Sequence, residues 1–350
     1  MILFNPEHDL CLANGDANYA PPESAMKFGK DCSRIMDIIV PACRRSRFAT
    51  APSLWGWNLV ARNRLLKAGL STGELPTVAQ IEKIRQLSHR RHAIAASQYI
   101  SSAMQKGDCV AEELFDTESI ERFIDLYGEV VLKAPWSGSG KGLRWISRDT
   151  FSDSDRGWCK KVIAKQGSVI GERRVEVVEN FALLFYLGDE VDFVGYSLFR
   201  CENGAYKSNV LASDMHILDV LSKYVDVIEI EESKHALTEY LTENFLGHYE
   251  GYLGVDAFIY LNGDGYTLRP CIEINVRMTM GLVARIYYDL NKKSAPVIGT
   301  DSMILEDGKF RMEVVYSSDN NFLREMLNPA VRVLTPVLSD TQYAIAIFRL

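Results

Sequence analysis

The alternation of hydrophobic and polar positions is most regular between residues 254 and 277. Two segments, 254–261 and 266–274, carry apolar residues in the pattern of β-strands, and the turn residues Asn-Gly-Asp-Gly occupy positions 262–265 between them. A turn of this composition between two such segments is a strong signal for a β-hairpin. We therefore predict two antiparallel strands that lie side by side.

Other segments show the periods of strands and helices in mixed order. Strands are predicted over 2–4, 129–133, 168–172, 181–187, 191–199, 205–211 and 343–348. Helices are predicted over 54–68, 89–104, 116–126, 233–246 and 279–290. The segments within 181–211 are separated by short glycine-containing turns and are expected to form an antiparallel meander. The fold class is therefore α/β, with α+β character in parts.

Two stretches near the start of the chain are harder to assign. Residues 5–22 contain Asn-Pro, Asn-Gly and Pro-Pro pairs, which interrupt regular structure, so a long loop is expected there. Residues 35–40 are apolar enough for either a strand or the buried end of a helix. With the helix over 54–68, the residues up to about 86 make a small α/β unit.

Length and charge narrow the class of protein. A chain of 350 residues with 47% hydrophobic residues exceeds the usual size of one core, so two or three closely packed units are expected. The formal net charge of -7 argues against the broad basic surface that a nucleic-acid partner requires. The basic runs at 44–47 and 90–92 are typical of solvated surface.

The beginning of the chain and its cysteines suggest a compartment. Charged residues appear after four positions of the N-terminal strand, and no apolar run approaches about 18 residues, so neither a signal peptide nor a membrane span is predicted. Seven scattered cysteines without Cys-x-x-Cys spacing favour reduced, mostly buried thiols. A soluble cytoplasmic protein without a membrane partner is expected.

The second strand of the hairpin carries polar and charged side chains on one face. Because side chains alternate along a strand, Glu273, Asn275 and Arg277 share a face. The simpler interpretation is a half-exposed sheet with polar residues outward. However, Asp256 lies on the partner strand and adds a third oxygen donor, and three such oxygens on one face are costly without a cation. Hard oxygen ligands suit Mg²⁺, so Asp256, Glu273 and Asn275 are candidate metal ligands.

A glycine-rich loop follows the strand over 129–133. Lys133 ends that strand, and Gly138, Gly140, Lys141 and Gly142 follow within nine residues. Glycines let backbone N–H groups approach phosphate oxygens, and lysines supply positive charge. The loop is neither a Walker A motif nor a G-x-G-x-x-G motif, and a plain turn remains an alternative interpretation.

The segment 169–179 has a pattern that fits a nucleotide. An extended stretch there offers backbone groups for adenine, and Glu172 and Glu179, seven residues apart, offer carboxylates for the ribose hydroxyls. An exposed, charged strand end is the alternative.

In this order, the lysine with its glycine loop, the two spaced glutamates, Asp256 and the motif Glu273-x-Asn275-x-Arg277 resemble the ATP-grasp superfamily. That superfamily includes D-alanyl-D-alanine ligases, biotin carboxylase and carbamoyl phosphate synthetase. The resemblance covers roughly residues 86–290. It implies an ATP-grasp-like fold with an N-terminal α/β domain over 1–86, a small subdomain over 87–175 and a large subdomain over 176–350.

The resemblance also implies roles for individual residues in binding ATP. Lys133 would bind the α- and β-phosphates, and Ser139, Gly140 and Lys141 would belong to the loop that closes over the phosphates. Glu172 and Val175 would lie at the adenine hinge, and Glu179 would bind the ribose. Glu176 is the alternative if the hinge shifts in register. A further cation before the glycine loop would be Arg90 or Arg91, with Arg90 taken as the candidate.

The remaining roles concern chemistry. By the same resemblance, Asp256, Glu273 and Asn275 would bind Mg²⁺, with Mn²⁺ as an alternative. Arg277 would steady the acyl phosphate or the substrate carboxylate, and Arg277 and Lys133 would be the catalytic residues. Lys207, in the turn after Gly204, is expected to be an ordinary surface lysine.

The activity implied is that of an ATP-dependent carboxylate-amine ligase. The carboxylate would be activated as an acyl phosphate and attacked by an amine, with ADP and phosphate released. The substrates would be small carboxylates and amines, with amino acids and peptides among the candidates. A phosphotransferase on the same scaffold and a non-catalytic ATP-binding protein are the alternatives.

Polar residues also follow the first strand, where ligands often gather in α/β sheets. Substrate contact by Glu7, His8 or Asp9 is therefore a hypothesis, and a purely structural turn is the favoured interpretation for these positions.

Overall fold

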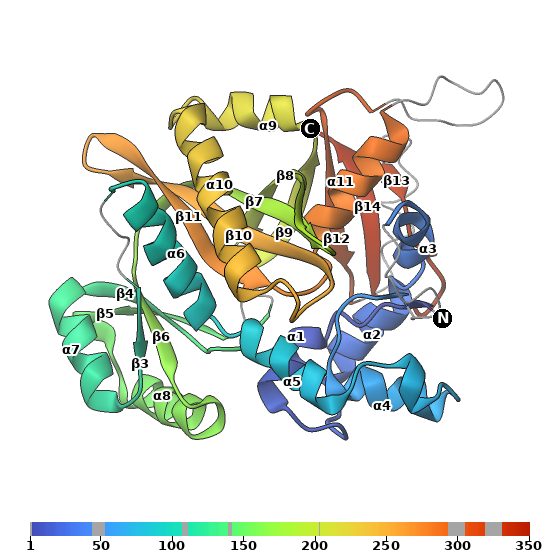
Figure 1. Ribbon diagram of the computed structural model, residues 1–350, viewed down its shortest axis with the longest axis horizontal. Helices are drawn as coiled ribbons and strands as arrows, with labels where there is room; N and C mark the ends of the chain where they lie inside the picture. The colour runs from blue at the N-terminus through green and yellow to red at the C-terminus, as the bar shows by residue number, and fades with distance from the viewer. Residues whose placement is uncertain are drawn as a thin grey trace.

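The computed structural model describes residues 2–43, 53–106, 111–138, 142–202, 204–292, 305–318 and 331–350. Its framework is a large sheet, a smaller sheet and a short parallel strand pair near the N-terminus (Figure 1).

The large sheet contains the predicted hairpin. Its strands are β7 (Glu176–Leu187), β8 (Val191–Glu202), β9 (Ala205–Leu211), β10 (Gly251–Asn262), β11 (Gly265–Asn275), β12 (Phe310–Tyr316), β13 (Val331–Val333) and β14 (Tyr343–Arg349). They are arranged in the order β11-β10-β7-β8-β9-β12-β14-β13. Asn262 lies opposite Gly265 at the tip of the antiparallel β10–β11 pair, so the hairpin is confirmed. The predicted meander is confirmed as β7–β8–β9.

Alternating side chains of the large sheet bury both of its faces. Phe181 and Leu183 of β7 pack into a core with α6 (Arg91–Ala103) and α10 (Val227–Asn244). Their neighbours Ala182 and Leu184 point the other way and pack with α11 (Met280–Asn291). Burying one leucine side chain contributes about 1.5–3 kcal/mol, which fixes the register of the strand. Helix α9 (Asp214–Leu221) adjoins α10 in the chain.

The smaller sheet has helices packed against it. Its strands are β3 (Ala111–Leu114), β4 (Glu129–Lys133), β5 (Leu143–Ser147) and β6 (Val169–Arg173), in the order β3-β6-β4-β5. The helices α7 (Thr117–Tyr127) and α8 (Asp153–Gln166) pack against this sheet, at the lower left of Figure 1. Phe123 and Val130 belong to the shared core.

The N-terminal region is mostly helical. Strands β1 (Ile2–Leu3) and β2 (Ser53–Leu54) pair in parallel. The helices are α1 (His8–Asn14), α2 (Glu23–Asp31), α3 (Ile35–Ile39), α4 (Leu59–Lys67) and α5 (Val78–Leu87). In Figure 1, α1, α2, α4 and α5 lie together below the large sheet. The segment 35–40, which the sequence left open, is therefore helical until Ile39.

The prediction of a loop throughout 5–22 is wrong in its first half. Residues 8–14 form helix α1, and the Asn-Gly pair that suggested a loop is the end of that helix. Gly15 has φ of 76°, and its N–H donates to the carbonyl of Cys11, as in a left-handed helix cap. Pro6 precedes the helix. The two turn signals thus bracket a short helix.

Two helix boundaries also differ from the prediction. Leu54 lies in β2, and α4 begins only after Asn58, whose side chain accepts a hydrogen bond from the Ala61 N–H at 2.8 Å. Such a cap stabilises a helix by about 1 kcal/mol. Helix α10 begins at Val227, six positions before the predicted start, because Asp226 caps it.

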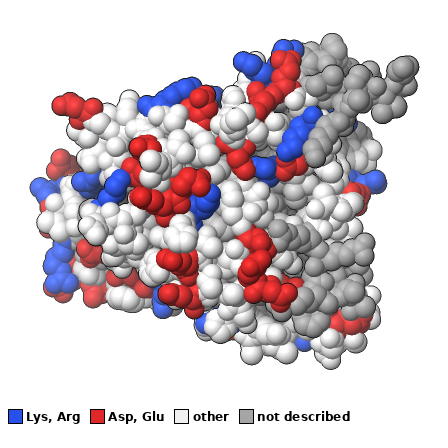
Figure 2. Space-filling view, turned by 45° about the horizontal axis from the view of Figure 1, so that its top comes forward, with Lys and Arg blue, Asp and Glu red and all other residues white. Residues whose placement is uncertain are grey.

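In the described part of the chain, no helix combines the length and hydrophobicity needed to cross a membrane. The six cysteines of that part are free; Cys11, Cys32, Cys159 and Cys271 are buried, whereas Cys201 is exposed. Basic and acidic side chains are interspersed on the face shown in Figure 2.

Candidate active site

The hairpin brings the predicted metal ligands together. Asp256 lies directly opposite Glu273 in the β10–β11 register. The Asn275 Nδ2 group donates to Asp256 Oδ2 at 3.2 Å. Burial and the neighbouring carboxylate of Glu273 raise the pKa of Asp256 to about 7. The two carboxylates therefore repel each other strongly when both are ionised.

This donor set fits a magnesium ion. A divalent cation would keep both carboxylates ionised and remove their repulsion, and Asn275 Oδ1 has a lone pair beyond the hydrogen bond it accepts. Among the described residues, no cluster of three or more His, Cys, Asp or Glu side chains is arranged to hold a metal. The site therefore needs ligands from outside the protein, such as phosphate oxygens and water, as Mg²⁺ sites usually do.

Arg90 joins the start of the glycine loop to this pair. Its guanidinium donates to the Ala134 carbonyl at 2.5 Å, to Ser137 Oγ at 2.8 Å and to Glu273 Oε1 at 2.8 Å. The Arg90 Nε–H is buried and has no hydrogen-bond partner in the described residues. Arg91 points elsewhere: it donates to Glu113 on β3. The structure thus distinguishes the two arginines: Arg90 contacts the glycine loop and Arg91 does not.

A second charged cluster joins the two sheets. Lys133 Nζ of β4 lies 2.7 Å from Glu172 Oε1 of β6, and Arg269 Nη1 of β11 lies 3.4 Å from Glu172 Oε2. Burial would raise the pKa of Glu172, but Lys133 and Arg269 outweigh it and hold the pKa below its ordinary value. Two cations thus surround one carboxylate, and the cluster has a net positive charge.

The glycine loop is anchored at both ends. The Ala134 N–H donates to the Gly142 carbonyl at 2.9 Å, which closes the loop at its base. The Trp136 indole donates to the Arg85 carbonyl at 2.8 Å, and the Arg85 guanidinium stacks 4.0 Å from the indole ring centre. The predicted phosphate-loop residues, Ser139, Gly140 and Lys141, lie outside the described residues.

Arg277 meets the N-terminal helix. Its Nε and Nη2 groups donate to both oxygens of Asp9 on α1, and Nη2 also donates to Asn275 Oδ1 at 2.8 Å. Of the three candidates after the first strand, only Asp9 reaches the site. Glu7 Oε1 pairs with Arg64 Nη1 at 2.5 Å. His8 Nδ1 forms a hydrogen bond with Asn58 Nδ2 at 3.1 Å.

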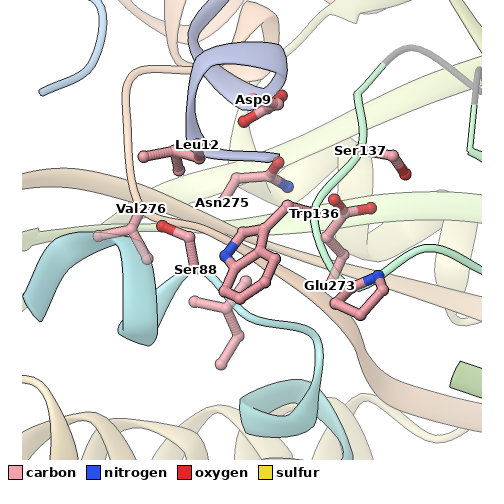
Figure 3. A pocket seen from close by; sticks show the side chains of 10 residues that line it. Asp9, Leu12, Ser88, Trp136, Ser137, Glu273, Asn275 and Val276 are labelled. Carbon is pink, nitrogen blue, oxygen red and sulfur yellow. The ribbon is translucent and has the colours of Figure 1, made fainter. Parts of the chain in front are cut away.

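A small cavity lies where these parts meet. Its volume is about 10 Å³, which is about the minimum that admits one water molecule. Figure 3 shows Asp9 approaching it from α1, Ser137 from the glycine loop and Glu273 and Asn275 from β11.

The hinge residues lie apart from the metal ligands. Val175 is half-buried in the connection between β6 and β7. In the β7–β10 register, Ala182 lies opposite Asp256, so these two side chains share a face of the sheet. Glu179 is three positions before Ala182 in β7. Because side chains alternate along a strand, Glu179 points to the opposite face from Asp256. Burial raises the pKa of Glu179. The roles of Val175 and Glu179 in binding ATP stay predictions, as does that of Glu176, which is exposed at the start of β7.

The structure adds residues that the sequence did not single out. Arg269 is four positions before Glu273 in the same strand, and this even spacing was a usable signal for a shared face. Ser137 carried no comparable signal, because its contact with Arg90 joins positions 47 residues apart. Lys207 lies on the surface, 4.0 Å from Glu202, as expected.

Comparison with known proteins identifies the fold. No protein-family model and no curated protein matches the sequence. Among solved structures, N5-carboxyaminoimidazole synthetase from Staphylococcus aureus, complexed with ADP, matches with a TM-score of 0.52. It is 15% identical, and the match covers 86% of this chain and 76% of that one.

Two further structures agree. The biotin carboxylase domain of 2-oxoglutarate carboxylase from Hydrogenobacter thermophilus, in complex with MgADP, ADP and bicarbonate, matches with a TM-score of 0.53 at 15% identity, over 91% of this chain and 73% of that one. N5-carboxyaminoimidazole ribonucleotide synthetase from Thermus thermophilus matches with a TM-score of 0.51 at 13% identity, over 100% of this chain and 94% of that one. These are ATP-grasp enzymes, so the predicted fold is confirmed.

Proposed function

We propose that this protein is an ATP- and magnesium-dependent ligase that activates a carboxylate as an acyl phosphate for attack by an amine. The observation that carries the proposal is the position of Arg90. Its guanidinium contacts the base of the glycine loop and Glu273 of the candidate metal site at once, across 183 residues of sequence. Phosphates held by that loop would therefore lie next to the metal ligands.

The proposed roles of the residues follow from their charges. Lys133 and Arg90 would bind phosphate oxygens, and Asp256, Glu273 and Asn275 would hold Mg²⁺. The bound metal would offset charge on the phosphoryl group during its transfer. Arg277 would steady the acyl phosphate; it lies just after β11 and donates to Asn275 Oδ1 at 2.8 Å.

We also propose three units, 1–86, 87–175 and 176–350, with ATP bound between the last two. The small sheet and the large sheet fall on the two sides of the boundary at 175. The Glu172–Arg269 pair brings these sheets into contact at that boundary, which supports a site formed by both.

The reaction has two balanced steps. A carboxylate oxygen attacks the γ-phosphorus of ATP, which gives the acyl phosphate and ADP. The amine nitrogen then attacks the acyl carbon, which gives an amide and inorganic phosphate after loss of a proton. Small carboxylates are the proposed first substrate. Bicarbonate is included because it is bound in one of the structural neighbours.

The test measures ADP, free phosphate and products with Mg²⁺-ATP and a pool of carboxylic acids, bicarbonate and amino acids. Equal amounts of ADP and phosphate that appear only with substrate support the ligase. A second assay adds hydroxylamine, which traps an acyl phosphate as a hydroxamate. ADP without free phosphate, together with a phosphorylated product, would instead identify a phosphotransferase. ATP binding without turnover across the pool would identify a non-catalytic protein.

A further inference from the structure

The hydrogen bonds of Arg277 leave it little capacity for a substrate carboxylate. A guanidinium has five N–H donors. The Nε–H donates to Asp9, the two N–H groups of Nη2 donate to Asp9 and Asn275, and one of Nη1 donates to the Met278 carbonyl. One donor remains, on Nη1. The two-point grip that arginine normally makes on a carboxylate is therefore already occupied by Asp9.

Asp9 in turn lies at the entrance to the glycine loop. A Cβ atom placed on Gly138 would come within 2.6 Å of Asp9 Oδ2, so only glycine allows the two to approach this closely. The Asp9 side chain is 20% exposed and lines the small cavity described above. Burial would raise the pKa of Asp9, but Arg277 outweighs it and lowers the pKa, so the carboxylate is ionised.

The cavity beside Asp9 has the size and lining for an ammonium group. At about 10 Å³ it admits one water-sized group. Two carboxylates, Asp9 and Glu273, and two hydroxyls, Ser88 and Ser137, are among its lining groups. The other side of the cavity is largely apolar, and the two carboxylates accept from Arg277 and Arg90. Each carboxylate still has lone pairs beyond these bonds, so its oxygens can accept from a further N–H group. The lining therefore favours a group with several N–H donors and a positive charge over a second carboxylate.

We propose that Asp9 receives the ammonium group of the second substrate, so that this ligase uses a primary amine that binds as a cation. The inference rests on the proposed function and specifies its amine subsite. Arg277 keeps Asp9 in position on one side, and the ammonium group approaches the oxygens of Asp9 from the cavity. The bound ammonium group gives up one proton to water before its nitrogen attacks the acyl carbon. Helix α1 thereby becomes part of the amine site.

The test uses two nucleophiles that differ in charge. Hydroxylamine is largely uncharged near neutral pH and does not need a carboxylate partner, whereas amino acids and simple alkylamines are ammonium ions. The variant Asp9→Asn keeps an oxygen that accepts from Arg277 and removes the charge. We expect the KM for the amine to rise about 10- to 100-fold, the loss typical of a charged hydrogen bond. Hydroxamate formation should stay within about threefold of wild type, because the remaining side-chain oxygen still accepts from Arg277 and the candidate metal ligands are unaltered.

The remaining outcomes decide against the inference. An equal loss of hydroxamate and amide in Asp9→Asn would show that Asp9 serves Arg277 alone. Unchanged kinetics with both nucleophiles, or a wild-type enzyme that forms hydroxamate but no amide with any amine of the pool, would also overturn it. A wild-type protein that forms no hydroxamate with any carboxylate would overturn the proposed function itself. The control is Asp16→Asn, an exposed carboxylate just after α1, which should change neither rate.

Discussion

The two charged clusters of the site are built in opposite ways. Glu172 is buried between two cations, Lys133 and Arg269, and its carboxylate is held ionised. Asp256 is buried beside another carboxylate, Glu273, and its pKa rises to about 7. In the second cluster Glu273 pairs with Arg90, whereas Asp256 accepts only from the neutral amide of Asn275 among the described residues.

This contrast separates a structural cluster from one that awaits a ligand. Removing one partner from a buried ion pair leaves an unpaired charge and is costly. Two half-buried carboxylates face each other at a cost that a cation would relieve. The first arrangement should therefore contribute to stability besides the phosphate contact proposed for Lys133, and the second should contribute mainly to metal binding and turnover.

The largest expected effect is at the acidic pair. Glu273→Ala and Asn275→Ala should each lower turnover by at least about 100-fold, because the metal would lose a ligand while the sheet keeps its core. ADP release with saturating substrate is the measurement. The control Asp264→Asn changes an exposed residue in the turn of the same hairpin and should keep normal activity. Near-normal turnover in both alanine variants would refute the metal assignment.

A comparable loss should separate the two neighbouring arginines. Arg90→Ala should lower turnover about 100-fold, because Arg90 contacts both the glycine loop and Glu273. Arg91→Ala should change it less than about twofold, since Arg91 makes a partly exposed ion pair with Glu113. Matched assays of the two variants test this. Equal losses would mean that the contacts of Arg90 do not persist when ATP binds.

Changing the cluster of Lys133, Glu172 and Arg269 should alter the stability of the protein. Glu172→Ala should lower the free energy of unfolding by about 3 kcal/mol, because Lys133 and Arg269 would stay buried without their counter-charge. Urea denaturation followed by circular dichroism measures this. As a control, Glu129→Ala breaks an exposed pair with Arg174 and should cost no more than about 0.5 kcal/mol. A Glu172→Ala protein as stable as wild type would show that the cluster is not structural.

The smallest effect is a dependence of stability on pH in the metal-free protein. The pKa of Asp256 is raised on folding, so its contribution is present below the ordinary carboxyl pKa and is lost as pH rises through about 7. The expected slope is about 1 kcal/mol per pH unit between those values. The measurement is the free energy of unfolding of wild type and of Asp256→Asn as a function of pH. The difference between the two slopes should equal the contribution of Asp256.

The two slopes must be compared because buried histidines change the pH dependence of the free energy of unfolding in the opposite direction to Asp256. Burial lowers the pKa of His8 and His92 to about 4, so they add stability as pH rises over part of the same range. They contribute equally to both proteins and cancel. Identical slopes for wild type and Asp256→Asn would contradict the raised pKa.

The parts of the fold that the sequence predicted are those with local signals. The β10–β11 hairpin follows from alternation and one turn, and it places Asp256 opposite Glu273 without further information. Helix α8 was missed because Gly157 and many polar residues hide its apolar face, although Ser152 and Gly167 cap its two ends. Helix α1 was missed because helix ends and loops use the same residues, Asn, Pro and Gly.

The parts that could not be predicted depend on contacts between distant segments. Whether Arg90 or Arg91 faces the glycine loop depends on how α6 packs, and both are equally plausible in sequence. The even spacing of Arg269 and Glu273 was available, but its pairing with Glu172 joins two sheets. For Glu179, only the strand register showed which face of the sheet its side chain occupies.

The contact between Asp9 and Arg277 has a consequence for the synthesis of the protein. The two residues are 268 positions apart, so the chain is nearly complete before the second partner leaves the ribosome. Closing so long a loop is slow and is rewarded only when the distant contacts form. A nascent or truncated chain that ends before β11 would contain the glycine loop but neither Glu273 nor Arg277. Under the proposed function, such fragments would lack a metal ligand and an arginine of the site and would not activate a carboxylate.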